Sequence, residues 1–283
     1  MDNKYCNKCG LVIQPESTVC PQCGTPILKH NAKKQVLSIA IGILVFILVS
    51  GLFSYFTYFR SEQINNDAVR EMSSGGNPAK TAALLEDSVN KTTDDTLKIT
   101  ILINQGYAYV AAGDTEKAIE SFNKAGELAA PDSLDDYIIK ANLAELNNDF
   151  VAAEDFYLKA VEIAPEDYQA NTSIGVFYLG ILPGNEDFYD FEKALNYNLK
   201  AYKIQADNIT TENLAVNYFF LEDYDTAIEY YLKTNLTAVP DDNFMLGVSY
   251  LMIGDDINAK KYIRTAYDMG YELDEEYLDF INS

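Results

Sequence analysis

The sequence holds four cysteines, and their spacing is typical of a metal site. Cys6 and Cys9 form one Cys-x2-Cys pair, Cys20 and Cys23 form a second, and ten residues separate the two pairs. A Cys-x2-Cys turn can aim two thiolates at one ion, and two such turns complete a tetrahedral Zn–S4 site. Sulfur would then fill all four positions and leave none for a catalytic water. The pattern therefore predicts structural zinc.

Residues 5–27 resemble a short prokaryotic zinc ribbon in this spacing and in Gly10 and Gly24, which follow the second cysteine of each pair. The resemblance implies a zinc-ribbon domain over residues 1–28. Its folding should depend on the metal, because the segment has few apolar residues to bury. Two disulfides or a redox Cys-x2-Cys site are the alternatives. A redox motif normally needs a thioredoxin-like βαβ context, for which there is no room here.

Residues 36–59 read VLSIAIGILVFILVSGLFSYFTYF and carry no charge. As a helix, these 24 residues would span about 36 Å, enough to cross a ~30 Å hydrocarbon core. We therefore expect one transmembrane helix in the lipid bilayer, with a buried soluble helix as the alternative. Its C-terminal aromatic residues suit a membrane interface. Two pairs of small residues would allow weak self-association through this helix: Ser38 with Gly42, and Ser50 with Ser54.

Charge is distributed unevenly about this apolar run. A basic juxtamembrane linker over residues 29–35 precedes it, whereas only Arg60 follows it closely. The positive-inside rule then places the N-terminus in the cytoplasm and the C-terminal part outside, and a reducing compartment suits four zinc-binding thiolates. The formal net charge is +3 for residues 1–35 and −25 for residues 60–283. Such an acidic body is repelled by nucleic acid and by anionic lipid surfaces, which favours neutral or basic protein partners.

Residues 96–273 repeat with a period of about 34 residues. One recurring element places a small residue three before an aromatic or small one: Gly106/Tyr109, Ala141/Ala144, Gly175/Tyr178, Ala215/Tyr218 and Gly247/Tyr250. A second element places alanine four before a large side chain: Ala118/Phe122, Ala153/Tyr157, Ala227/Tyr231 and Ala259/Ile263. Small residues let two helices cross closely, and the larger ones fill the gaps.

This pattern resembles the tetratricopeptide repeat (TPR). The resemblance implies a mostly α fold, a TPR-like α-solenoid of about five repeats whose concave groove binds a protein or peptide. The third repeat departs from the pattern and is partly Sel1-like, with roughly seven extra residues between Tyr178 and Ala194. Residues 60–95 are a linker or a degenerate helical repeat, and residues 274–283 are expected to form a capping helix.

In this family the first helix of each repeat lines the groove. Projection onto the chain selects Ile103, Tyr107, Asn142, Glu145, Val176, Leu179, Val216, Phe219, Phe220, Phe244, Val248 and Leu251. This lining is apolar with an acidic sector, and it lacks the lysines and arginines with which some relatives clamp a terminal carboxylate. An apolar segment with basic flanks is a better match. Packing between neighbouring repeats is the alternative role for many of these residues.

No catalytic set emerges from the sequence, and we expect no enzymatic activity. The single histidine, His30, belongs to the basic flank, and the acidic body has neither histidine nor cysteine. Asp241 and Asp242 do not lie in an EF-hand loop. The predicted function is a membrane-anchored interaction scaffold with a cytoplasmic zinc ribbon and an extracytoplasmic TPR array. The alternative is a membrane-tethered regulator whose ribbon contacts nucleic acid or a transcription component while the array senses a partner.

Overall fold

A computed structural model of the chain describes residues 4–6, 8–14, 17, 19–26, 55, 57–71, 76–180, 186–234 and 239–283. The chain divides into two compact units, Met1–Phe56 and Thr57–Ser283. The predicted basic linker and the predicted membrane run lie outside the described residues, except for Tyr55 and residues 57–59. None of the helices described is both long and apolar enough to cross a membrane.

The N-terminal unit contains a short antiparallel ribbon. Strand β1 (Lys4–Tyr5) pairs with β2 (Val12–Ile13), with Tyr5 opposite Val12. An isolated bridge joins Val19 and Pro26 farther along. The buried cluster here consists of Cys6, Ile13 and Cys20. Two of its three members are cysteines, so apolar burial alone gives this unit little stability.

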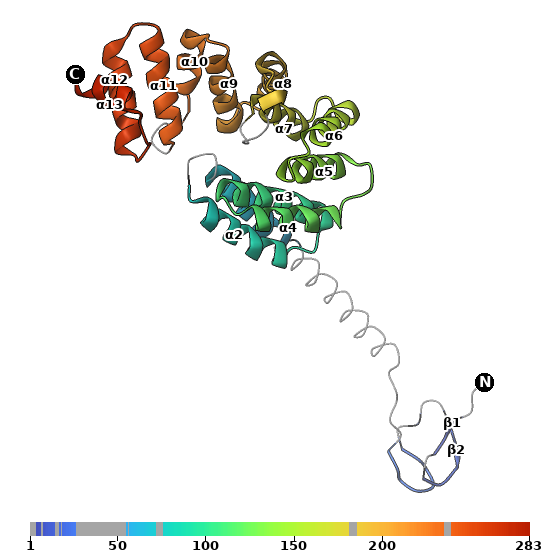
Figure 1. Ribbon diagram of the computed structural model, residues 1–283. Coiled ribbons are helices and arrows are strands. Elements are labelled where there is room, and N and C mark those ends of the chain that lie inside the picture. Colours follow the sequence, from blue (N-terminus) through green and yellow to red (C-terminus); the bar gives the residue numbers. More distant parts are fainter. Residues whose placement is uncertain are drawn as a thin grey trace. The chain divides into compact units, whose positions relative to one another are not determined.

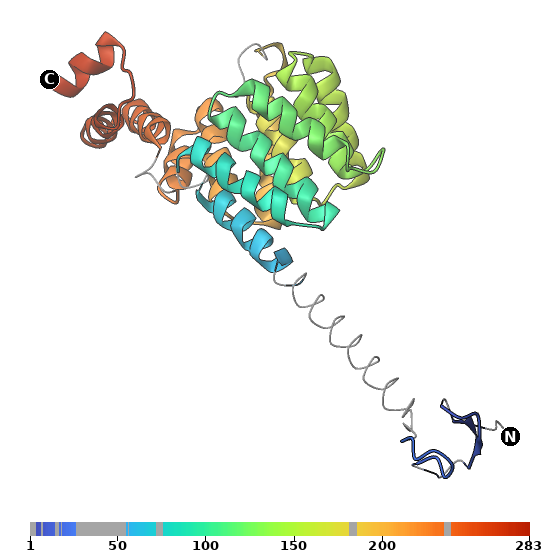
Figure 2. The same ribbon diagram turned by 90° about the horizontal axis from the view of Figure 1, so that it is seen from below.

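The second unit is helical throughout its described part. Residues 57–71 form a helix, and a 3-10 turn, η1 (Glu186–Phe188), precedes α8. The other helices are α2 (Pro78–Lys91), α3 (Asp95–Ala111), α4 (Thr115–Gly126), α5 (Leu134–Leu146), α6 (Phe150–Ile163), α7 (Tyr168–Leu179), α8 (Phe191–Ile204), α9 (Asn208–Phe220), α10 (Tyr224–Tyr231), α11 (Pro240–Met252), α12 (Asp256–Asp268) and α13 (Glu275–Asn282). Figure 1 shows these helices following one another along the array, and Figure 2 shows them from below.

The helices pack in consecutive pairs: α3 with α4, α5 with α6, α7 with α8, α9 with α10, and α11 with α12. Glycines allow the close crossings within several pairs. A Cβ added at Gly106 would lie 2.6 Å from the Phe122 ring, and one at Gly247 would lie 2.6 Å from Ile263. The predicted mostly α, TPR-like solenoid is therefore confirmed, and the repeating small residues have the packing role expected of them.

One turn recurs between the two helices of a pair. The residue two before the second helix of the pair has a left-handed φ: 75° at Gly113, 59° at Asn148, 61° at Glu222 and 80° at Gly254. The next residue is an aspartate whose side chain accepts a hydrogen bond from a backbone amide of the following helix: Asp114, Asp149, Asp223 and Asp255. This N-cap satisfies an amide that the helix itself leaves free.

The third pair differs in its core. At the position where other pairs bury an aromatic or aliphatic side chain, α8 buries Asn198 completely. Its Nδ2 donates to Asn217 Oδ1 at 2.9 Å, and Asn217 donates to the carbonyl of Phe191 at 2.8 Å. A hydrogen-bonded asparagine pair thus takes the place of one apolar core side chain in the repeat that departs from the sequence pattern.

The ends of the array are also helical. Residues 57–71 and α2 pack onto α3 through a shared core that includes Ala68, Leu85 and Ile101, and the Ser88 hydroxyl donates to the carbonyl of Ser61 at 3.2 Å. At the other end, Arg264 of α12 donates to the carbonyl of Ile281 in α13. The segment left open between a linker and a degenerate repeat therefore contains a packed helical pair.

Candidate metal centre and first-helix face

The four cysteine sulfurs converge on one point in the N-terminal unit. Their Sγ atoms all lie within 4.8 Å of one another. Cys6 and Cys23 are 3.6 Å apart, and Cys9 and Cys20 are 3.5 Å apart. Tetrahedral Zn–S bonds of about 2.3 Å place sulfurs about 3.8 Å apart, whereas a disulfide needs about 2 Å. The cysteines are free thiols, so the site is built for zinc and the disulfide alternative is wrong.

The backbone shapes this site as two matching turns. The amide of Gly10 donates to the carbonyl of Cys6 at 2.8 Å, and the amide of Gly24 donates to that of Cys20 at 3.0 Å. Both glycines have left-handed φ values, 74° and 72°. Any other residue would be strained there, which explains why glycine follows the second cysteine of each pair.

At two of the four cysteines, Cys6 and Cys23, hydrogen bonds favour the thiolate form that a metal requires, whereas the pKa of Cys9 is raised. Backbone amides of Lys8 and Cys9 lower the pKa of Cys6. The Thr25 hydroxyl lies 3.0 Å from Cys23 Sγ and lowers the pKa of that thiol to about 6. Thiolates are the ligands that zinc binds. Thr25 is thus a supporting residue that the cysteine spacing alone does not identify.

In the second unit, the first helices of the pairs adjoin one another. We call the surface of α3, α5, α7, α9 and α11 the first-helix face. Contacts join α5 to α7, α7 to α9, and α9 to α11. Hydrogen bonds join the first three helices: Asn142 donates to the Tyr107 hydroxyl at 3.2 Å, and that hydroxyl lies 3.4 Å from Ser173 Oγ.

The predicted groove residues divide by burial. Ile103 and Leu179 are 1% and 3% exposed and belong to core clusters, so they are corrected from groove to core positions. Asn142 is also buried, at 7%. Phe244 stacks on Tyr271 with ring centroids 4.5 Å apart. The positions that keep exposed surface are Tyr107, Glu145, Val176, Val216, Phe219, Phe220, Phe244, Val248 and Leu251.

The predicted acidic sector at Glu145 is partly satisfied within the protein. The Tyr157 hydroxyl donates to Glu145 Oε2 at 2.9 Å. Burial raises the pKa of Glu145 to about 7 in spite of this hydrogen bond. This carboxyl therefore belongs to the polar network beneath the face.

A second acidic group on the same face was not predicted as a binding site. It consists of Glu212 on α9 with Asp241 and Asp242 on α11. Glu212 lies four residues before Val216, and Asp241 lies seven before Val248, which puts each on the same side of its helix as a predicted groove residue. That helical spacing was the signal available in the sequence.

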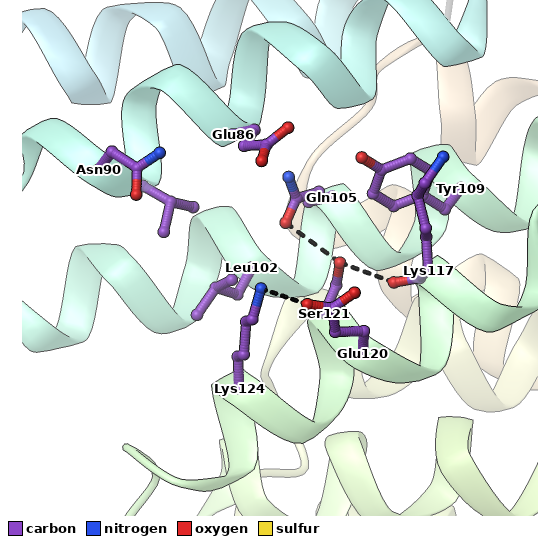
Figure 3. A pocket seen from close by; sticks show the side chains of 10 residues that line it. Glu86, Asn90, Leu102, Gln105, Tyr109, Lys117, Glu120, Ser121 and Lys124 are labelled. Carbon is purple, nitrogen blue, oxygen red and sulfur yellow. Dashed lines mark hydrogen bonds and ion pairs between the residues drawn. The ribbon is translucent and has the colours of Figure 1, made fainter.

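Figure 3 shows a small cavity bounded by α2, α3 and α4. Its volume is about 170 Å³. Ser121 donates to Gln105 at 3.1 Å, and Lys124 pairs with Glu120 at 2.7 Å. Two lysines and two glutamates line this cavity. Their charges cancel, so the lining favours neither an anionic nor a cationic ligand.

Two family models match parts of the chain. A zinc-ribbon domain matches residues 5–27, and the tetratricopeptide repeat matches residues 99–132 and 212–233. No curated protein matches the sequence.

Solved structures share the helical fold. The APC/C hetero-tetramer Cut9-Hcn1 has a TM-score of 0.54 at 14% identity, covering 82% of this chain and 45% of that one. Pseudomonas aeruginosa pilF has a TM-score of 0.50 at 18% identity, covering 66% of this chain and 89% of that one. Likeness at such identities concerns the fold alone. Residues 5–27 are thus a zinc ribbon, and Thr57–Ser283 folds as a TPR-like α-solenoid.

Proposed function

We propose that this protein is a membrane-anchored scaffold that binds a protein or peptide partner on the first-helix face. The supporting observation is a series of apolar side chains on that face that the fold does not fully bury. They are Val176, Val216, Phe219, Phe220, Val248 and Leu251. Apolar surface gathered on one face of a helical array is the kind of surface that such arrays use to bind partners.

Site-specific photo-crosslinking in cells tests the binding face. A photoreactive amino acid at Val216 or Val248 is expected to trap the same discrete partner. Val151, a 71% exposed residue on the second helix of its pair, is the matched control and should trap none. Identical crosslinking patterns from Val151 and Val216 would contradict the proposal.

The proposed anchor is the uncharged run over residues 36–59. With lysines before it and one arginine after it, this run would place the zinc ribbon in the cytoplasm and the acidic array outside. Alkaline phosphatase fused after Ser283 is expected to be active, and a green fluorescent protein at the same position should stay dark. The reverse pair of results would rule out this topology.

A second candidate is a membrane-tethered regulator whose ribbon contacts a transcription component or nucleic acid. Exposed apolar residues on the ribbon favour a protein contact: Tyr5, Val12 and Val19 are 59%, 53% and 50% exposed. Retention of the full chain on DNA or RNA, lost steeply with added salt, would favour the nucleic-acid form of this role. Loss of retention on replacing Lys8 would then assign it to the ribbon.

A further inference from the structure

The packed array begins directly where the uncharged run ends. Phe59 is the last residue of that run, and Ser61 is already only 1% exposed. The Ser88 hydroxyl of α2 donates to the carbonyl of Ser61 at 3.2 Å, which fastens the first turns of the helix over residues 57–71 to the array. Arg60 is the one residue between the run and this contact. The proposed anchor and the array are therefore joined without a flexible tether.

The end of α2 lies beside the last residues of the run. The helix over residues 57–71 and α2 pack antiparallel, because the hydrogen bond just described joins them near the run and Ala68 shares a buried cluster with Leu85 farther from it. From that hydrogen bond, three residues toward the run on each helix reach Lys91, the last residue of α2, and Tyr58. These two residues are therefore at about the same level.

The start of α3 lies at this level too. Gln105 Nε2 donates to the carbonyl of Ala82 at 3.3 Å, and Asn104 Nδ2 donates to Asn65 Oδ1 at 2.9 Å. Followed back along the helices, both bonds place residues 99–100 level with the first buried turn. The connection between α2 and α3 therefore projects past that turn toward the run. We call residues 57–61 and 88–100 the proximal end of the array.

The proximal end does not share the strong negative charge of the array. Residues 60–283 carry −25, whereas the proximal end carries +1. Its charged residues are Arg60, Lys91, Asp94, Asp95 and Lys98. Lys91 pairs with Asp87, but Arg60 and Lys98 have no ion-pair partner in the described part of the chain. This end would therefore escape the repulsion that a strongly acidic surface meets at a bilayer.

Polar residues of the α2–α3 connection limit how deep the chain can sit. Thr93 and Asp94 are exposed, and an unpaired charge in hydrocarbon is costly. The hydrocarbon layer would therefore end before the level of Tyr58 and Phe59, whose side chains are 40% and 53% exposed and suit the headgroup region. Residues 36–54 would remain to cross the layer. Their number, 19, lies within the roughly 17–25 residues of a spanning helix.

We propose that the proximal end of the array is a surface that contacts the phospholipid headgroups of the membrane in which the chain is anchored. Tyr58 and Phe59 would lie in the interface, and Arg60 and Lys98 would face lipid phosphates. The array would then stand at a fixed height on the bilayer, and its first-helix face would meet partner segments close to the membrane. The inference rests on the proposed function, because it uses the proposed anchor.

Fluorescence quenching by lipid tests this surface. The chain contains no tryptophan, so one introduced tryptophan reports its own surroundings. Full-length Y58W, T93W and T115W are reconstituted into phosphatidylcholine vesicles with or without a lipid that carries a nitroxide on its headgroup and quenches nearby tryptophan. Y58W and T93W are expected to lose most of their emission to the nitroxide. T115W is the matched control and should keep its emission, because Thr115 is also an exposed threonine but lies beyond the far end of the 17-residue α3, about 25 Å away.

The three variants separate this surface from the anchor on which it depends. Quenching of Y58W without quenching of T93W would overturn the contact surface and leave the anchor intact. Absence of quenching in Y58W would overturn the anchor and the surface with it. Equal quenching of T93W and T115W would also overturn the surface, because the array would then lie along the bilayer instead of meeting it at one end. T96W probes the same connection if T93W loses its helical circular dichroism.

Discussion

At the scale of single residues, the zinc site depends on more than its four ligands. Thr25 directs its hydroxyl at Cys23 Sγ from 3.0 Å. Groups that support metal ligands in this way typically change metal affinity 10- to 100-fold when removed. T25A is therefore expected to weaken zinc binding about tenfold in competition with a chromogenic chelator. S17A alters another hydroxyl of the ribbon as a control, and equal affinities for T25A and S17A would show that the Thr25 hydroxyl plays no part.

The buried carboxyl of Glu145 should make the folding stability of the array depend on pH. Its folded pKa of about 7 lies above the ordinary value of 4.5, so folding takes up a proton between these pH values. Stability from this group is thus present at low pH and is lost as pH rises through about 7. Because E145Q cannot ionise, its free energy of unfolding should rise relative to the unaltered chain by about 1–3 kcal/mol between about pH 5 and about pH 8.

Denaturant unfolding followed by circular dichroism measures this difference at each pH. E166Q, at an exposed glutamate in the turn before α7, is the control and should track the unaltered chain. If the free energies of unfolding of E145Q and of the unaltered chain differ by the same amount at every pH, then burial does not hold Glu145 protonated.

At the scale of elements, the turn between α9 and α10 contains an avoidable backbone strain. Glu222 has a φ of 61° at a position where two other pairs have glycine, and a non-glycine residue costs roughly 1–2 kcal/mol in that conformation. E222G is expected to stabilise the array by about 0.5–1 kcal/mol, and G254A to destabilise it by a similar amount. The Gly254 Cβ would meet no neighbouring atom, so packing does not confound the second measurement. Destabilisation by E222G would show that the Glu222 side chain stabilises the turn.

The pairing of elements could be predicted because it depends on residues near one another in sequence. Gly106 and Phe122 recur at a fixed spacing, and the crossing they permit follows from their sizes. Exposure on the first-helix face was harder to predict. Ile103 and Leu179 have the same helical phase as exposed groove residues, but the neighbouring helix pairs cover them. The contact between α9 and α11 joins helices that start about 30 residues apart in the sequence, and no local pattern states that proximity.

At the scale of the whole molecule, the two units should respond separately to metal removal. Among the described residues, the ribbon's buried cluster consists of residues of the first unit, and the core clusters of the array consist of residues of Thr57–Ser283. Zinc supplies the folding energy that a small ribbon lacks. A chelator added to the full chain in detergent is therefore expected to abolish amide-exchange protection around the cysteines while changing the array's free energy of unfolding by less than about 0.5 kcal/mol. Re-addition of zinc controls for reversibility, and a large fall in array stability on chelation would show that the two units are coupled.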